Sequence, residues 1–184
     1  TTVQNYNIGD LVSGRIHLSG IVTDGNGIKT LTYSVDGGNE YELVDIKEHK
    51  DGSCSFSVPV DTTKMADGAA VCWFKATDKQ GTTGLSSFLF FVDNTTPSTR
   101  FLSPKPDEVV NGIFSVAGSA SDIVGLQSLT WDLNGESGEF ELVAGNPYWI
   151  KEFDLRNYDK KNAVFTLTAT DIAGNVRVEK LNIA

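Results

Sequence analysis

Residues 14–27 read GRIHLSGIVTDGNG, and residues 112–125 read GIFSVAGSASDIVG, so three glycines and one aspartate recur at a constant offset of 98. Further along the chain, the run Ala-Thr-Asp-x-x-Gly at residues 76–81 recurs at residues 169–174, at an offset of 93. A single change in loop length accounts for the difference between the two offsets. Self-similarity of this kind marks repeated structural units. The chain therefore contains two copies of one module.

The boundary between the copies is a polar stretch that ends in proline, Asp93-Asn94-Thr95-Thr96-Pro97. Polar, proline-containing stretches are typical of linkers between domains. We place repeat 1 at residues 1–94 and repeat 2 at residues 95–184. Each copy then has about 90 residues, which is enough for one small domain with a core of its own.

Each copy is predicted to be all-β. Apolar residues alternate with polar or small ones, for example along residues 16–22 and 54–60, and this period of two is typical of half-buried strands. Turn signals such as Asn134-Gly135 separate the alternating runs. About seven short strands in about 90 residues predict an immunoglobulin-like β-sandwich in each copy. We expect Tyr33 and Trp131, at matching positions on the third strand, to lie in the two cores.

The composition narrows the range of partners. The chain has 184 residues with 15 Lys and Arg against 24 Asp and Glu, a formal net charge of −9. Nucleic acid is therefore not an expected partner, because phosphate binding requires a basic surface. Cations are the more natural small ligands. No window of the sequence approaches the roughly 18 apolar residues of a membrane span, so we expect none.

The recurring motifs carry a family resemblance. The runs Gly-x5-Gly-x3-Asp-x2-Gly, Ala-Thr-Asp-x2-Gly and Asp-Asn-Thr-Thr-Pro resemble bacterial immunoglobulin-like repeats, over nearly the whole chain. The resemblance implies an extracellular or cell-surface location in bacteria, and neighbouring repeats of the same parent chain as partners. Such modules serve as adhesin stalks, as spacers in secreted enzymes and as binding domains. The fold by itself does not choose among these functions.

Catalysis has little support in the sequence. The two histidines are His17, at a polar-facing strand position, and His49, in a charged turn, and both are expected to be solvated. No metalloprotease, serine-hydrolase or phosphate-binding glycine motif occurs. We therefore expect no catalytic residues and no enzyme activity in this chain. Accessory domains of a secreted enzyme remain an alternative to a spacer or adhesion stalk.

Four aspartates occupy matching loops of the two copies. Asp24 and Asp122 follow the second strand, and Asp78 and Asp171 precede the last strand. In an immunoglobulin topology these two loops lie at the same end of the module, and the chain leaves at the opposite end. We therefore expect the linker to reach the loops of the second copy.

These positions predict a calcium site at the junction of the repeats. Calcium takes about six to eight oxygen ligands from carboxylates, carbonyls and water. Related calcium-binding bacterial repeats, like cadherins, place ions at such junctions, and the resemblance implies the same here. Calcium is the only cofactor we expect. The expected ligands are Asp93, Asn94, Glu108, Asp122 and Asp171.

A matching half-site is expected at the start of the first copy. It would consist of Asp10, Asp24 and Asp78. Aspartates in loops also cap turns through their own backbone, and the spacing Asp-x-x-Gly would be selected by a tight turn without any metal. Turn capping is therefore the alternative for all of these aspartates.

The two cysteines lie on inward-facing positions. Cys54 and Cys72 fall on strands that are expected to belong to opposite sheets. A disulfide between them would close a loop of about 19 residues and stabilise the fold by roughly 3 kcal/mol. However, Cys72 aligns with Phe165, and the second copy contains no cysteine. Two buried free thiols are therefore the alternative.

The outward-facing positions of the last two strands differ between the copies. The first copy has Val71, Trp73, Leu89 and Phe91 there, whereas the second has mostly polar residues. A contiguous exposed apolar patch usually marks an interface, and Trp is favoured at binding hot spots. The four residues are a candidate binding face for a protein or a carbohydrate. The alternative is that residues 3–8 or a neighbouring domain cover them.

Overall fold

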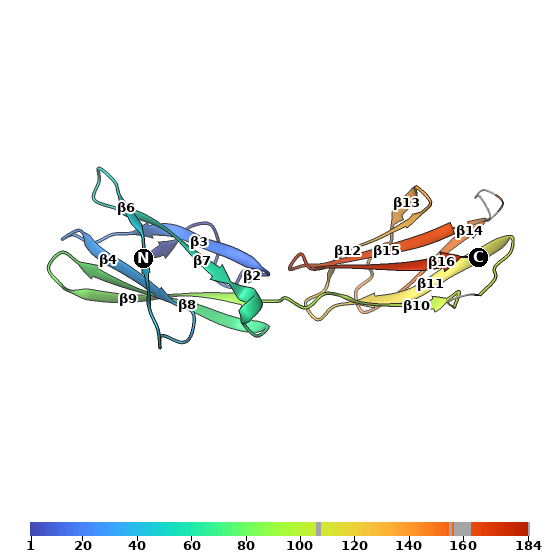
Figure 1. The fold of residues 1–184 in the computed structure, drawn as a ribbon, viewed down its shortest axis with the longest axis horizontal. Coiled ribbons are helices and arrows are strands. Elements are labelled where there is room, and N and C mark those ends of the chain that lie inside the picture. The colour runs from blue at the N-terminus through green and yellow to red at the C-terminus, as the bar shows by residue number, and fades with distance from the viewer. Residues whose placement is uncertain (106–107, 155, 157–162, 184) are drawn as a thin grey trace. The chain divides into compact units, whose positions relative to one another are not determined.

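The computed structural model shows two units, each built almost entirely from β-strands (Figure 1). The structure describes every residue except 106–107, 155, 157–162 and 184. Contacts divide the chain into Thr1–Asn94 and Thr95–Ala184.

The first unit is a sandwich of two sheets. One sheet has the order β1-β3-β7-β6, and the other has the order β2-β9-β8-β4-β5. The strands are β1 Thr2–Val3, β2 Leu11–Val12, β3 Arg15–Val22, β4 Ile28–Ser34, β5 Glu42–Val44, β6 Ile46–Glu48, β7 Cys54–Asp61, β8 Gly68–Asp78 and β9 Thr83–Val92. A short 3-10 helix, Thr62–Lys64, follows β7, and β2 pairs with β9 in parallel while the other pairings are antiparallel.

Alternation along the strands builds the core of the first unit. On β3, every second side chain from Ile16 to Val22 points inward, as the period of two requires. Leu18, Leu31 and Phe90 are fully buried. Burying a side chain of this size stabilises a fold by about 1.5–3 kcal/mol.

The second unit is also a two-sheet sandwich, with the orders β10-β11-β14 and β13-β12-β15-β16 in the described residues. Its strands are β10 Ser98–Ser103, β11 Ile113–Ser121, β12 Leu126–Leu133, β13 Glu136–Glu139, β14 Tyr148–Asp154, β15 Ala163–Asp171 and β16 Val176–Ile183. Trp131, Trp149 and Phe165 stack in its core, with ring centroids 6.0–6.4 Å apart for Phe165 against each Trp. This core is more aromatic than that of the first unit.

In each unit, one glycine lets the first strand lie very close to the strand with which it pairs, β1 with β3 and β10 with β11. A Cβ at Gly20 would lie 1.9 Å from the carbonyl oxygen of Thr2. A Cβ at Gly118 would lie 2.3 Å from the carbonyl oxygen of Arg100 and 2.4 Å from Cζ2 of Trp149. Both distances are far below van der Waals contact. The repeated glycine is therefore a packing requirement shared by the two units.

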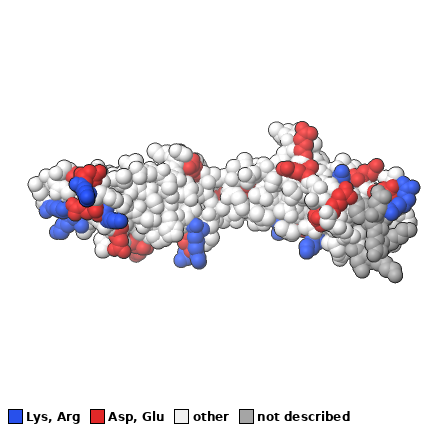
Figure 2. Space-filling view, turned by 90° about the horizontal axis from the view of Figure 1, so that it is seen from above, with Lys and Arg blue, Asp and Glu red and all other residues white. Residues whose placement is uncertain are grey.

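The prediction of two all-β immunoglobulin-like sandwiches is confirmed. Tyr33 and Trp131 are buried, at 7% and 6% exposure. Trp131 lies on the third strand of its unit, as expected, whereas Tyr33 lies on the fourth, because the two short strands β1 and β2 precede β3 in the first unit. Among the described residues, no helix has the length and apolar character needed to span a bilayer. On the face seen in Figure 2, Lys and Arg side chains are interspersed with Asp and Glu and form no continuous basic surface.

Candidate functional site

Asp171 is the last residue of β15 and is fully buried. Asn175 donates hydrogen bonds to both of its carboxylate oxygens. The backbone N–H of Asn175 donates to Oδ1 at 2.8 Å, and its side-chain Nδ2 donates to Oδ2 at 2.9 Å. The same Nδ2 lies 3.2 Å from the carbonyl oxygen of Thr95, to which it also donates. Asn175 thus fixes the direction of the Asp171 carboxylate.

Asp122 follows β11 and is partly buried. Its Oδ1 accepts a hydrogen bond from the backbone N–H of Val124 at 2.9 Å, the usual geometry of an aspartate at a turn. The carbonyl of Gly125 in this loop accepts from the N–H of Ile172, at 3.1 Å. The loops that carry Asp122 and Asp171 are therefore joined through their backbones.

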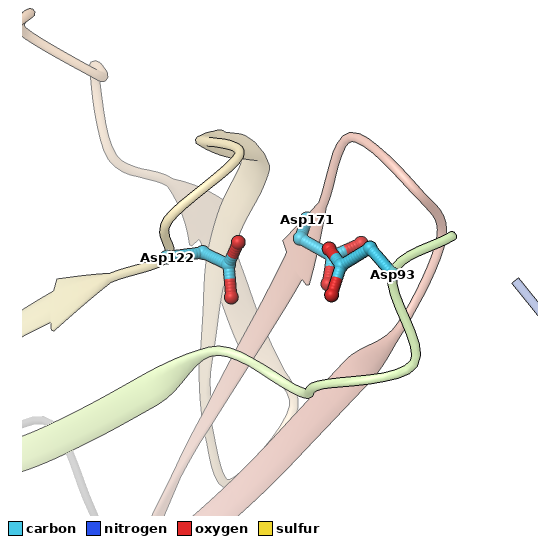
Figure 3. Close-up of side chains that lie close together, drawn as sticks. All are labelled: Asp93, Asp122 and Asp171. Carbon is cyan, nitrogen blue, oxygen red and sulfur yellow. The ribbon is translucent and has the colours of Figure 1, made fainter. Parts of the chain in front are cut away.

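Asp93 lies in the segment that leads from β9 to β10, and its side chain is 1% exposed. Its backbone N–H donates to the carbonyl of Val12 at 3.0 Å. One carboxylate oxygen from each of Asp93, Asp122 and Asp171 lies within 4.8 Å of the others (Figure 3). Carboxylates at this spacing repel one another, and a cation among them removes both the repulsion and the desolvation penalty. An oxygen-only ligand set of this kind suits a hard cation such as calcium.

The side chain of Asn94, another expected ligand, is hydrogen-bonded to Gly14 and Thr62 of the first unit. Its Oδ1 accepts from the N–H of Gly14 at 2.8 Å and from Oγ1 of Thr62 at 3.3 Å, and its Nδ2 donates to the carbonyl of Thr62 at 2.9 Å. Its own N–H donates to Asp67 at 2.8 Å. Asn94 therefore anchors the chain directly after Asp93.

Glu108 is also absent from the cluster. It is exposed, and its Oε2 accepts a hydrogen bond from the backbone N–H of Lys105 at 2.8 Å. Its carboxylate is therefore engaged with the backbone of Lys105.

The expected half-site of the first unit does not form a cluster of three carboxylates in the described residues. Asp78 accepts from the N–H groups of Gln80 and Thr82 at Oδ1 and from Nδ2 of Asn26 at Oδ2. These bonds, that from Asn26 above all, lower the pKa of the Asp78 carboxyl. Asp24 accepts from the N–H of Asn26 at 2.8 Å. In this unit the aspartates hold turns.

Asp10 completes the expected half-site and behaves in the same way. Its Oδ2 accepts from the backbone N–H of Asn7 at 2.8 Å. Asp24 and Asp78 do share a shallow pocket of ≈ 220 Å³, which Asp10 does not line.

The two cysteines lie on β7 and β8, in opposite sheets, and both are buried. The structure holds them as free thiols. Burial raises the pKa of the Cys72 thiol to about 12, and it also raises the pKa of Cys54. Neither thiol is therefore a reactive thiolate near neutral pH.

The candidate binding face lies on the outside of the β2-β9-β8-β4-β5 sheet. Val71 pairs directly with Leu89 across β8 and β9, and Leu89 and Phe91 are 36% and 41% exposed. Val71 and Trp73 are partly buried. The segment around Tyr6 packs against the core cluster, and the next residues run along the edge of the sheet, where Gly9 N–H donates to the carbonyl of Leu89.

Asn175 is the residue that sequence reasoning missed. It aligns with Thr82 of the first unit, whose backbone N–H makes the same bond to Asp78. The alignment showed a polar residue at this place, but not that its amide would reach both the aspartate and the carbonyl of Thr95. His17 and His49, which the sequence places on the surface, are both exposed.

No family model matches the chain, and no curated protein matches it. Among solved structures, it is similar to a 1.5-MDa bacterial ice-binding adhesin, at 18% identity and a TM-score of 0.48 over 95% of this chain and 60% of that one. It is also similar to dimeric latent PorU from Porphyromonas gingivalis, at 13% identity and a TM-score of 0.43 over 98% of this chain and 19% of that one. A third structure, the endo-beta-1,4-mannanase from Thermotoga petrophila, has 22% identity and a TM-score of 0.39 over 48% of this chain and 18% of that one. These likenesses are too distant to carry functional information.

Proposed function

We propose that this chain is a non-catalytic, two-repeat segment of a bacterial extracellular or cell-surface protein, where it acts as a spacer or adhesion stalk stiffened by calcium. The proposal rests on the three carboxylates of Asp93, Asp122 and Asp171, which lie within 4.8 Å of one another. Calcium bound there would tie the linker segment to the two loops of the second unit. A spacer gains from such a tie because an ion that links a connecting segment to a folded unit limits bending.

Burial supports a cation at this cluster. Asp93 and Asp171 are 1% and 0% exposed, and buried carboxylates are strongly disfavoured unless hydrogen bonds or a positive charge compensate them. No ion pair in the described part of the chain involves Asp122 or Asp171. Three side chains with loop carbonyls and water could supply the ligands, with a dissociation constant of about 10⁻⁴–10⁻³ M, as in extracellular modules.

Thermal unfolding in calcium and in excess chelator tests the proposal. At a calcium concentration about ten times the dissociation constant, binding stabilises the native state by about 1.4 kcal/mol, which raises the Tm of a domain of this size by several degrees. Small-angle scattering of the same samples should show a more restricted ensemble with calcium than with chelator. Identical melting and scattering in both conditions would rule out the calcium site.

A matched pair of variants distinguishes loss of calcium binding from a general loss of stability. Asp171→Asn keeps the shape of the side chain and removes its charge, and it should abolish the calcium-dependent rise in Tm. Asp78→Asn makes the equivalent change in the first unit and should leave that rise intact. The proposal is wrong if both variants respond to calcium like the parent chain.

A binding role for the first unit is a second candidate function. The observation that favours it is the apolar face formed by Val71, Trp73, Leu89 and Phe91, two of which are more than a third exposed. The second unit has Thr166 at the place of Trp73, so the fold does not require an apolar residue there. A protein or glycan partner would cover this face.

A further inference from the structure

The outer face of the second unit carries a shallow groove of ≈ 460 Å³ over β13, β12 and β15. We propose that this groove binds a neutral saccharide. Six polar side chains line it: Thr130, Asp132, Ser137, Glu139, Thr166 and Thr168. Its volume falls within the range of about 300–1,000 Å³ that is typical of small-molecule sites.

Strand register explains why these side chains meet. Directly paired residues form two rows across β13, β12 and β15. One row is Glu139–Thr130–Thr168, and the other is Ser137–Asp132–Thr166. Directly opposed side chains in antiparallel strands have Cβ atoms about 4.5–5.5 Å apart. The six side chains therefore form a compact grid on one face, and several can reach one sugar ring at the same time.

The hydrogen-bonding capacity of the grid is largely unused by the protein. Among the described residues, the hydroxyls of Thr130, Thr166 and Thr168 have no hydrogen-bond partner, and Glu139 forms no ion pair. Asp132 accepts one long hydrogen bond, from the N–H of Gly135 at 3.4 Å. Hydroxyls that donate and accept, beside carboxylates that accept, are the groups that recognise the hydroxyls of a sugar.

The charge of the groove and the groups at its base favour a neutral ligand. No Lys or Arg lines it, which disfavours phosphate and other anions. Trp131 lies under Gly138, where an added Cβ would come within 2.9 Å of the indole. The glycine thus leaves the indole edge close to the groove. Trp131 itself is 6% exposed, with Nζ of Lys151 5.0 Å from its ring centroid, so the apolar contact to the C–H groups of a sugar ring comes from the threonine methyl groups.

The first unit lacks this arrangement. Thr32 and Lys75 occupy the positions of Thr130 and Thr168. The hydroxyl of Thr32 donates to the carbonyl of Lys75, and Nζ of Lys75 lies 5.9 Å from the centroid of the Tyr41 ring. The groove is therefore a property of the second unit and is not dictated by the fold.

An amide NMR titration of the whole chain tests the proposal. The probes are the methyl glycosides of glucose, galactose, mannose and N-acetylglucosamine, each added to about 50 mM, since a shallow site implies millimolar affinity. At least one probe should give saturable shifts at residues 130–132, 137–139 and 166–168. Absence of such shifts with all four probes would overturn the proposal.

Variants show whether the polar grid does the binding. Thr168→Val replaces a hydroxyl by a methyl in a residue that suits a strand, and it should weaken binding roughly tenfold. Glu139→Gln should weaken it by a similar factor. Thr170→Val changes the next residue on the same face, outside the groove, and should leave the affinity unchanged. Equal affinities for all three variants and the parent chain would show that the grid does not bind the sugar.

Discussion

Asp78 of the first unit and Asp171 of the second hold matching positions at the ends of β8 and β15, but different groups surround their carboxylates. In the first unit, Asn26 donates to the second carboxylate oxygen of Asp78. In the second unit Val124 stands at the position of Asn26, and Asn175 donates to Asp171 from the other side of the loop. Asp78 is thus enclosed by amides of its own loops, whereas Asp171 has two further carboxylates close by.

The same aspartate of the module can therefore have two roles: it holds a turn in both units, and in the second it is also a candidate cation ligand. The backbone bonds that make the turn are the same in both units: Thr82 N–H to Asp78 and Asn175 N–H to Asp171. The turn therefore explains why the aspartate recurs, and it needs no metal. What differs is that the carboxylates of Asp93 and Asp122 lie close to that of Asp171, whereas Asp24, the counterpart of Asp122, forms no such cluster with Asp78 in the described residues.

Substitution of the repeated glycine, Gly20 in the first unit and Gly118 in the second, is expected to change the stability of the two units the most. Gly118→Ala should destabilise the second unit by about 2–3 kcal/mol, because the added Cβ meets the Arg100 carbonyl and the core indole of Trp149. Gly20→Ala should cost the first unit only about 1 kcal/mol, because its clash is with a strand of two residues that can detach. Urea unfolding followed by Trp fluorescence measures both, since Trp73 reports on the first unit and the other two Trp residues report on the second.

Gly84→Ala is the control for these variants. Gly84 lies in β9 with open space where a Cβ would be, and its substitution should change stability by no more than about 0.5 kcal/mol. If Gly20→Ala destabilised its unit as much as Gly118→Ala does, the expectation that β1 detaches more easily than β10 would be wrong.

Low pH should also reduce the stabilities of the two units to different extents, but the difference should be smaller than that between the glycine variants. Hydrogen bonds from neighbouring side chains lower the pKa values of four carboxyls in the first unit: Asp36, Asp51, Asp61 and Asp78. In the second unit, hydrogen bonds from Arg156 lower the pKa of Asp154. A carboxyl whose folded pKa lies below its ordinary value of 3.8 contributes stability above that pH, and the contribution is lost as the pH falls through the folded pKa.

The first unit should therefore lose more stability than the second between about pH 5 and about pH 2. Urea midpoints of the two Trp signals across this range provide the measurement. Asn26→Ala removes the main cause of the shift at Asp78 and should reduce the acid sensitivity of the first unit. An equal loss of stability in both units would contradict the assignment of the acid sensitivity to the four carboxyls of the first unit.

Exchange of the outer-face residues is expected to have the smallest effect on stability. Trp73→Thr with Leu89→Asn gives the first unit the residues found at Thr166 and Asn182 of the second. The free energy of unfolding should change by no more than about 0.5 kcal/mol, because these side chains already lie partly in water. A loss of more than about 2 kcal/mol would mean that the face is part of the core, and the second candidate function would then be wrong.

Much of the fold could be read from periodicity. Alternation placed Cys54 and Cys72 in the core and on opposite sheets, and the repeat placed Tyr33 and Trp131 at matching buried positions. The candidate site was read less completely. Asp93, Asp122 and Asp171 come together, but Asn94 turns toward Thr62 and Gly14 instead. A linker amide can serve either as a ligand or as an anchor, and sequence gives no measure of which partner it meets.

The sequence by itself determined that there are two modules, that both are β-sandwiches, and which residues face their cores. It could do so because strand alternation and turn glycines are local properties, set by a period of two and by backbone sterics. Only the tertiary structure decided that Asn175 orients Asp171, and that Glu139, Thr130 and Thr168 form one row. Such rows depend on which strands pair and in which register, and alternation within one strand does not identify a partner residue far away in the chain.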